Sequence, residues 1–283
     1  MRIFTLSEIK NLCQQYGFNP SKQYGQNYLL NIEPIELMVD AAEIKKTDTI
    51  VEIGPGFGIL TFALADHAKN VVAFEIEKKL QPYWAEQIKK FSNIKIEWGN
   101  ILYQFSKCAD SFEKYKVVAN IPYQITSPIL KLFLEDVKNK PQTMVLLVQK
   151  EVAERICAKP GEMSVLATTV QFFGNAEIVA YVPRNLFWPI PQVDSAIIKI
   201  FNIGKMDFVL KKDFSVGDFF RFVRAGFVNR RKLLQKNLLS IVGKENKGKI
   251  EKIWEEMNFS RNVRAQELSV ADWIKLFDLW RED

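Results

Sequence analysis

Apolar runs alternate with helical patterns along the first 150 residues of the chain. Short apolar runs typical of buried strands occupy residues 49–54, 70–76, 94–99, 116–120 and 143–149. Between these runs, residues 58–68, 79–91 and 127–138 carry apolar side chains at helical spacing. This alternation predicts a mostly parallel sheet with helices on both faces, and it predicts a ligand site at the carboxyl ends of the strands.

Further elements are expected on either side of this alternating region. Residues 6–16 and 32–44 have helical patterns, and the polar, turn-rich residues 20–31 form an entry loop between them. Residues 177–183 and 195–201 are expected to pair as antiparallel strands that bracket a proline-rich loop, RNLFWPIPQVD.

The chain is long enough for one domain of about 200 residues and a smaller one. Residues 201–215 look like a linker that leads into helical sequence. We therefore expect an α/β domain at residues 1–204 and a small, basic α-helical domain at residues 205–283.

Composition excludes several kinds of chemistry. Cys13, Cys108 and Cys157 are too far apart in sequence for a metal knuckle and are expected to be reduced thiols. His67 is the only histidine and lies near the expected end of a helix, so imidazole-based catalysis and histidine metal sites are disfavoured. No apolar run approaches the roughly 18 residues that span a bilayer, and we expect a cytoplasmic protein.

The net charge of +6 and pI of about 9.0 suggest a polyanionic partner. Nearly all of the excess charge lies after residue 200, and residues 219–244 contain seven basic side chains and no acidic one. On a helical wheel one arc of about 140° holds most of these basic residues, Arg221, Arg224, Arg231, Lys232 and Lys236. A solvated helix face is the alternative, but the absence of interspersed acids favours phosphate contact, with a helix break near Gly226 or Asn229.

The glycine-rich stretch VEIGPGFGILT follows one expected strand and opens the next helix. Gly54, Gly56 and Gly58 let the backbone turn tightly and approach a ligand. Nineteen residues after Gly56, the next strand ends with Glu75, which can accept both hydroxyls of a ribose. The GxGxG spacing differs from the GxGxxG pattern of dinucleotide sites, so it favours S-adenosylmethionine (SAM) over NAD.

The tetrapeptide NIPY ends the strand at 116–120 and offers an amine-binding arrangement. The side-chain oxygen of Asn120 and the carbonyl of Ile121 can accept hydrogen bonds from both N–H groups of an exocyclic amine, which directs the nitrogen lone pair at a methyl group. Pro122 fixes the backbone and Tyr123 can stack on a flipped base. A plain proline turn after a strand is the alternative. The motif therefore predicts methyl transfer to a nucleobase amine without a metal or a histidine.

Several motifs, taken in order, resemble the KsgA-type small-subunit rRNA adenine dimethyltransferases. They include QNYLLN, VEIGPGFGILT, FEIEKKL, NIPYQITSPIL, QKEVAERICAKPG, MSVLATTVQFF, PRNLFWPIPQVDSAIIKI and AGFVNRRKLLQKNL. The resemblance covers roughly residues 20–240. It implies a Rossmann-like class I SAM methyltransferase fold with a seven-stranded sheet. The sequence shows no obvious oligomer face, and we expect a monomer. The implied reaction is dimethylation of the N6 amines of two adjacent adenines in the 3′-terminal hairpin of 16S rRNA during ribosome assembly.

The resemblance also implies roles for individual residues in the cofactor site. By this resemblance Asn27 and Leu29 cap the cofactor, Gly54 lies beneath it, and Glu75 holds its ribose. Asn120 would join the cofactor site to the substrate amine.

Two further roles and two departures follow from the same resemblance. Phe187 resembles the second aromatic wall around the target base. Asn100 stands where the family usually has an aspartate that contacts the cofactor adenine, and its oxygen can still accept from an amine but carries no charge. Gln124 stands where asparagine is more usual. A weakened enzyme is the alternative that these two changes leave open.

Two other functions remain as alternatives at this point. One is an Erm-type 23S rRNA adenine methyltransferase of the kind that confers macrolide resistance, which shares the glycine loop and an NIPY-like motif. The other is a non-catalytic RNA-binding assembly or transcription factor on the same fold. The stretches AKPGEMSVLATTVQFF and RNLFWPIPQVDSA, followed by NRRK, fit the small-subunit family better.

Overall fold

The computed structural model describes residues 4–20, 25–204 and 215–281, and it divides into two compact units. The first unit comprises the described residues of Met1–Ala153 and Asn175–Gly204. The second comprises those of Glu154–Gly174 and Lys205–Asp283.

A seven-stranded sheet forms the centre of the first unit. Its strands are β2 Thr49–Ile53, β3 Asn70–Glu75, β4 Ile94–Trp98, β5 Lys116–Asn120, β6 Thr143–Gln149, β7 Asn175–Val182 and β9 Ser195–Phe201. Their order is β4-β3-β2-β5-β6-β9-β7; the pairs from β4 to β6 are parallel, and β9 is antiparallel to both β6 and β7. The predicted mostly parallel sheet and the antiparallel pair that closes it are both confirmed.

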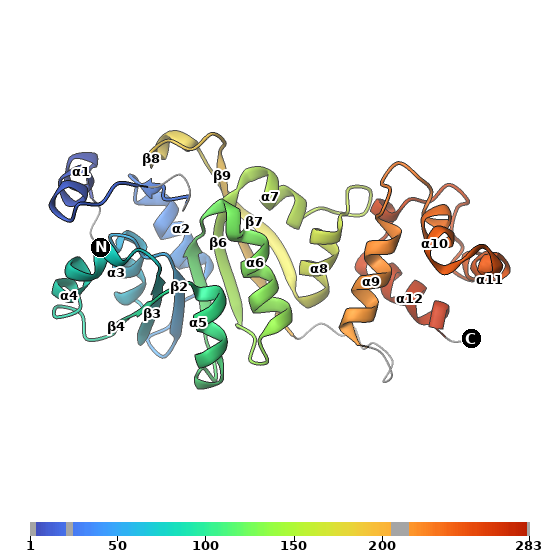
Figure 1. The fold of residues 1–283 in the computed structure, drawn as a ribbon, viewed down its shortest axis with the longest axis horizontal. Helices are drawn as coiled ribbons and strands as arrows, with labels where there is room; N and C mark the ends of the chain where they lie inside the picture. The colour runs from blue at the N-terminus through green and yellow to red at the C-terminus, as the bar shows by residue number, and fades with distance from the viewer. Residues whose placement is uncertain (1–3, 21–24, 205–214, 282–283) are drawn as a thin grey trace. The chain divides into compact units, whose positions relative to one another are not determined.

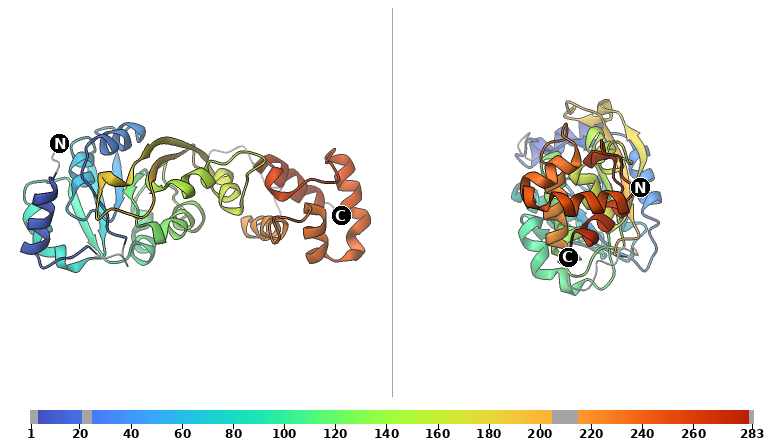
Figure 2. Two further views of the ribbon diagram at one scale, coloured as in Figure 1. Left: turned by 90° about the horizontal axis from the view of Figure 1, so that it is seen from above. Right: turned by 90° about the vertical axis from the view of Figure 1, so that its right-hand side faces the viewer.

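Helices cover both faces of this sheet (Figures 1 and 2). They are α1 Leu6–Gln15, α2 Glu33–Ala41, α3 Ile59–Ala65, α4 Gln81–Gln87, α5 Ile101–Cys108 and α6 Thr126–Lys131, with α7 Lys150–Ile156 after β6. On one face, α2 packs with α3 over apolar side chains such as Val71 and Val145. On the other face, Phe105 of α5 contacts Phe74 of β3 with ring centroids 5.8 Å apart. Because both faces are buried there, the central strands β5 and β6 carry continuous apolar runs instead of an alternating pattern.

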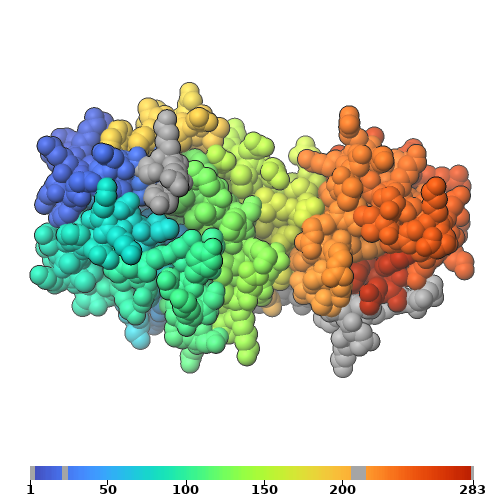
Figure 3. Space-filling view, viewed as in Figure 1, coloured from blue at the N-terminus to red at the C-terminus, as the bar shows by residue number. Residues whose placement is uncertain are grey.

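A two-stranded pair joins the entry loop to the proline-rich loop. β1, Tyr28–Leu29, is antiparallel to β8, Phe187–Trp188, and Leu29 lies opposite Phe187. The backbone N–H of Leu30 extends the contact by donating to the carbonyl of Leu186 at 2.8 Å. In the space-filling view the proline-rich loop, in yellow, lies at the surface near the blue N-terminal residues (Figure 3).

The second unit is helical and has an aromatic core. Its helices are α8 Val165–Phe173, α9 Val216–Gly226, α10 Leu234–Val242, α11 Lys247–Glu256 and α12 Val270–Arg281. Phe172 of α8 stacks on Phe219 of α9 with centroids 5.0 Å apart, and Phe219 meets Phe277 of α12. Residues 154–174 therefore group with the C-terminal helices, although the sequence suggested a boundary at 204. The division into separately folding domains at 1–204 and 205–283 stays a prediction.

The chain breaks its basic helical segment after Gly226, as expected. A Cβ at Gly226 would lie 2.3 Å from the Trp273 ring, so α9 and α12 approach closely here. The buried amide of Asn237 donates to the carbonyls of Gly226 and Asn229 at 2.6 and 2.9 Å. These bonds hold the turn between α9 and α10 in one shape.

Candidate active site

The glycine loop after β2 forms one wall of a pocket at the carboxyl ends of the strands. Gly54, Gly56 and Gly58 have φ values of 69°, 53° and 85°, which favour glycine over other residues. A Cβ at Gly56 would lie 2.8 Å from Cε1 of Tyr28, so this position also needs glycine for space. A Cβ at Gly54 would meet no atom within 4 Å, because that position faces open space.

Glu75 connects this loop to the end of β3. Its side chain is buried; Oε2 accepts from the N–H of Gly56 at 3.0 Å and Oε1 accepts from the N–H of Glu77 at 2.8 Å. Burial raises the pKa of the Glu75 carboxyl, and the hydrogen bonds from Glu77 and Gly56 oppose part of that rise. Each carboxylate oxygen has a second lone pair, so both can still accept from a ligand hydroxyl.

Glu52 is a pocket residue that the sequence reading did not assign. It is 1% exposed, and its Oε2 has no hydrogen-bond partner among the described residues. Burial raises the pKa of its carboxyl to about 8. The charge of Glu75 adds to this rise in pKa, and the nearby Thr61 hydroxyl opposes part of it, although that hydroxyl makes no hydrogen bond among the described residues. An acidic residue inside the apolar strand TIVEI was the signal in the sequence, because an unpaired buried carboxyl is costly.

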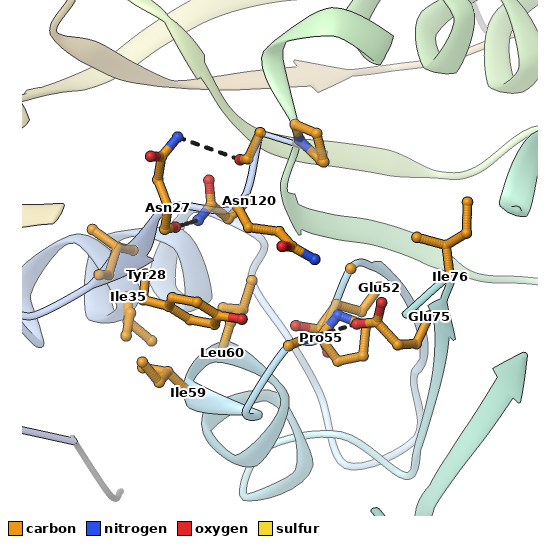
Figure 4. Close-up of a pocket in the computed structure, with 16 residues that line it drawn as sticks. Asn27, Tyr28, Ile35, Glu52, Pro55, Ile59, Leu60, Glu75, Ile76 and Asn120 are labelled. Atoms are coloured by element: carbon orange, nitrogen blue, oxygen red, sulfur yellow. Dashed lines mark hydrogen bonds between the residues drawn. The ribbon is translucent and has the colours of Figure 1, made fainter. Parts of the chain in front are cut away.

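Asn120 has a fixed amide orientation. Its Nδ2 donates to the backbone carbonyl of Asn27 at 3.2 Å, and the Asn27 side chain donates in turn to the carbonyl of Gly25 at 3.3 Å (Figure 4). Since the nitrogen is used as a donor, Oδ1 is the atom that remains to accept a hydrogen bond. Figure 4 shows Asn27 and Asn120 on one side of the pocket and Glu52 and Glu75 on the other.

Gly25 brings the entry loop against the NIPY turn. It has a φ of 57°, and a Cβ there would lie 2.6 Å from Oε1 of Gln124 and 3.2 Å from Cβ of Pro122. Gln124, one of the two departures from the family pattern, therefore lies against the loop that carries Asn27. Its side chain lies close to the backbone that orients Asn120.

The rest of the NIPY turn is tied to the sheet. Ile121 is buried and its N–H donates to the carbonyl of Leu147 in β6 at 3.2 Å. Pro122 has a φ of −53° and precedes a short 3₁₀ turn at Tyr123–Ile125. The Tyr123 hydroxyl lies 2.8 Å from the hydroxyl of Ser195, the first residue of β9. The turn is thus held at both ends by strands.

Two adjoining cavities lie at this edge of the sheet and share Gly54, Ile76 and Pro122. The first has polar side chains from several elements on its wall and is lined by Asn27, Leu29, Glu52, Gly54, Gly56, Glu75 and Asn120, among others. The second, of about 200 Å³, is mostly apolar and is lined by residues that include Ile53, Phe74, Ile101 and Asn100.

Asn100 begins helix α5 at the wall of the second cavity. Its Oδ1 accepts from the N–H of Leu102 at 3.0 Å and so caps the helix. The oxygen predicted to accept from an amine therefore already accepts one hydrogen bond from the protein, so only its second lone pair and the amide nitrogen remain for a ligand.

Phe187 lies beside Leu29, a predicted cofactor-binding residue, but outside both cavities. It is 1% exposed and pairs with Leu29 in the β1–β8 ladder, and neither cavity wall includes it among the described residues. Its role as an aromatic wall for the base stays a prediction.

The five predicted RNA-contacting residues are exposed on α9, on α10 and on the turn between them: Arg221, Arg224, Arg231, Lys232 and Lys236. Phe222, Val223 and Leu234 are buried on the opposite side, so the segment is amphipathic as predicted. Arg221 pairs with Asp218 at 3.0 Å, and the pair is largely exposed.

Two other features bear on the class of chemistry. Over residues 4–20, 25–204 and 215–281 no helix is long and apolar enough to cross a membrane, and no group of three His, Cys, Asp or Glu residues could hold a metal ion. His67 lies just beyond the end of α3, with its Nδ1 2.9 Å from the carbonyl of Ala63.

Residues 17–279 match the family model for ribosomal RNA adenine dimethylases. The chain belongs to this family. Ribosomal RNA small subunit methyltransferase A of Streptococcus equi subsp. zooepidemicus is 38% identical over 292 aligned residues that cover 100% of this chain and 99% of the relative. The protein of the same name from Streptococcus mutans is 39% identical with the same coverage.

Solved structures of similar adenine methyltransferases share the fold. The 23S rRNA methyltransferase ErmE has a TM-score of 0.72 and 26% identity, covering 89% of this chain and 98% of its own. A dimethyladenosine transferase from Plasmodium falciparum also has a TM-score of 0.72 and 26% identity, covering 88% and 95%. These matches confirm the predicted family, the Rossmann-like methyltransferase fold and the enzyme class, an rRNA adenine dimethyltransferase.

Proposed function

We propose that this chain transfers methyl groups from SAM to the N6 amines of two adjacent adenines in the 3′-terminal hairpin of 16S rRNA, late in assembly of the small subunit. The observation that carries the proposal is the orientation of Asn120. Its amide nitrogen donates to the Asn27 carbonyl, so its oxygen is available to accept a hydrogen bond from the substrate amine. Family membership supplies the reaction class.

The two cavities fit the parts of SAM. Glu52 and Glu75 supply buried carboxyl groups to the first cavity; their oxygens suit ribose hydroxyls, and a cationic ligand would favour their ionised forms and so lower their raised pKa values. The open space above Gly54 and the apolar second cavity suit a flat purine. When bound, SAM supplies an electrophilic methyl group on a sulfonium. Asn27 and Leu29 would cover it, and Asn100 would face its adenine.

Asn120 and Ile121 would align the substrate amine. An adenine amine is a weak nucleophile, because its lone pair is delocalised into the ring. Hydrogen bonds from both N–H groups of the amine, to Oδ1 of Asn120 and to the carbonyl of Ile121, favour a pyramidal nitrogen with its lone pair on the side of the methyl group. The Asn120 amide is oriented by the entry loop and the Ile121 N–H is bound to the sheet, so oxygens placed in advance would also stabilise the positive charge that forms on nitrogen.

Tyr123 would stack on the flipped adenine. Its ring belongs to the turn that carries Asn120, so stacking and amine alignment act on the same base. Phe187 is our candidate for the second aromatic surface; it is buried in β8, so this role requires it to become accessible when RNA binds.

The small subunit is favoured over the large one by the relatives. The proteins from the two Streptococcus species are named for the small subunit and align over the full chain at 38% and 39% identity. ErmE, a 23S rRNA methyltransferase, also shares the fold with a TM-score of 0.72, so the fold alone does not separate the substrates. With an assembling ribosomal subunit as its partner, we expect the protein to act in the cytoplasm as a monomer.

The basic face of α9 and α10 would contact rRNA phosphates. Arg221, Arg224, Arg231, Lys232 and Lys236 are exposed there, and phosphate contacts position a protein on RNA without reading its sequence.

Exchange of Asn120 for alanine tests the proposal. Since one accepting group and its preorganised dipole are lost, turnover on unmethylated small subunits should fall by about 10²–10³-fold. Binding of rRNA should be unchanged, and Asn139→Ala, which removes an amide that bonds to Phe112 away from the pocket, should remain active. Near-normal turnover of the Asn120 variant would refute the role of Asn120 in aligning the substrate amine.

A further inference from the structure

The hydrogen bond between Tyr123 and Ser195 joins the NIPY turn to the antiparallel half of the sheet. The two hydroxyl oxygens are 2.8 Å apart, although the residues are separated by 72 positions in the chain. Ser195 is 0% exposed and lies opposite Gln149 of β6 and Val182 of β7. Its hydroxyl is therefore fixed by strands on both sides.

The residue before Ser195 fixes the base of the proline-rich loop. Oδ1 of Asp194 accepts from the N–H of Arg184 at 3.0 Å, and its backbone carbonyl accepts from the N–H of Lys150 at 3.0 Å. Ser195 consequently cannot follow movements of that loop freely. It is a rigid reference point for the Tyr123 side chain.

The Tyr123 side chain carries its hydroxyl at the end of the ring that reaches Ser195. Tyr123 begins a 3₁₀ turn of three residues, and the ring is partly buried. A tyrosine ring moves between rotamers about its first side-chain torsion, and a hydrogen bond at the far end of the ring removes that freedom. A ring that stacks on a base must hold one plane, since stacking depends on ring orientation.

We propose that Ser195 is a positioning residue for methyl transfer, acting through the Tyr123 hydroxyl to hold the ring in the plane that the target adenine stacks on. This inference rests on the proposed function. Ser195 touches neither cofactor nor base in this role. The hydroxyl of Tyr123 has a purpose distinct from its ring, because the ring contacts the base and the hydroxyl contacts the sheet.

A double-mutant cycle tests the proposal. Ser195→Ala, Tyr123→Phe and the double variant are compared for single-turnover rate on unmethylated small subunits, with SAM saturating. Each single variant should lose about three- to tenfold in rate, the range expected for one hydrogen bond, and the double variant should lose no more than either. Dissociation constants for SAM and for rRNA should stay within twofold of wild type.

Matched variants separate positioning from folding. Tyr115→Phe removes another tyrosine hydroxyl, one that donates to the carbonyl of Asn139 at 2.8 Å, and should keep the wild-type rate. If Ser195→Ala folds poorly, Tyr123→Phe carries the test, because its hydroxyl lies on the less buried side of the bond. Multiplicative losses in the double variant, or unchanged rates in Tyr123→Phe, would overturn the proposal. Failure of the wild-type protein to methylate any small subunit would instead refute the proposed function itself.

Discussion

Replacement of Asn100 by aspartate should tighten SAM binding. Asn100 lines the apolar cavity, but its Oδ1 already accepts from the N–H of Leu102. The amide nitrogen is a donor and cannot pair with the donor amine of a purine, so only the second lone pair of the uncharged Oδ1 remains for that amine. An aspartate keeps one oxygen for the cap and presents a second, charged oxygen to the cavity.

The size of the effect follows from the number of hydrogen bonds. One new hydrogen bond from a neutral amine to a charged oxygen contributes about 1.5–3 kcal/mol, which corresponds to roughly 10–150-fold in the dissociation constant. Asparagine and aspartate cap helices about equally well, so the stability of α5 should change little. The change in affinity should therefore not be accompanied by a large change in melting temperature.

Calorimetric titration with S-adenosylhomocysteine and with its 6-oxo (inosyl) analogue measures this directly. The wild-type protein should distinguish the two ligands weakly, whereas Asn100→Asp should bind the adenosyl ligand at least tenfold more tightly than the wild type does and should discriminate against the analogue. Asn100→Ser is the matched control, since serine caps the helix without an amide. Equal affinity of wild type and Asn100→Asp would refute the assignment of Asn100 to the purine edge.

Two further predictions concern pH and charge. The pKa of Glu52 is raised to about 8, so the folded state holds a proton that the unfolded state releases near pH 4.5, and stability should be lost as pH rises from about 5 to 8. Glu52→Gln should reduce this loss of unfolding free energy by up to about 5 kcal/mol at pH 8, measured by urea unfolding. Glu75, whose pKa is also raised, still contributes in the same direction. An unchanged dependence of stability on pH would contradict a protonated Glu52. Charge reversal at Arg231 and Lys232 should weaken rRNA binding and flatten its salt dependence without changing SAM affinity. Charge reversal at the exposed Lys89 and Lys90 is the control and should leave rRNA binding unchanged. An unchanged salt dependence in the Arg231 and Lys232 variant would mean that this face is only solvated.

The contact between the glycine loop and Glu75 at the edge of the sheet could be predicted because it depends on local patterns. One buried strand is followed by glycines at 54 and 56, and the next strand ends in an acid. Once these two strands are parallel neighbours, Gly56 and Glu75 lie together. The structure adds the bond between them at 3.0 Å. Parallel pairing of β2 and β3 in register makes this meeting a direct consequence of the sequence.

Contacts between distant segments could not be predicted in the same way. The partner of Asn120 is a backbone carbonyl 93 residues earlier, and backbone acceptors leave no trace in residue types. The capping role of Asn100 was hidden for a related reason: a side chain at a strand end can serve the helix or the ligand, and only the geometry separates the two.

Burial also decided some positions that sequence alone left open. Phe187 looked available for a base, but pairing of β8 with β1 buries it in the core. Phe172 and Phe173 near the end of α8 pack on α9 aromatic rings, which groups residues 154–174 with the C-terminal helices. Apolar patterns show that a residue is buried but do not show which neighbour buries it.

The most direct test of the account is methylation of unmethylated small ribosomal subunits with SAM, followed by mapping of the modified bases. We predict N6,N6-dimethyladenine at two adjacent adenines in the 3′-terminal hairpin of 16S rRNA with the wild-type protein, and almost none with Asn120→Ala. Modification of 23S rRNA in large subunits instead, or no methyl transfer despite SAM binding, would contradict it.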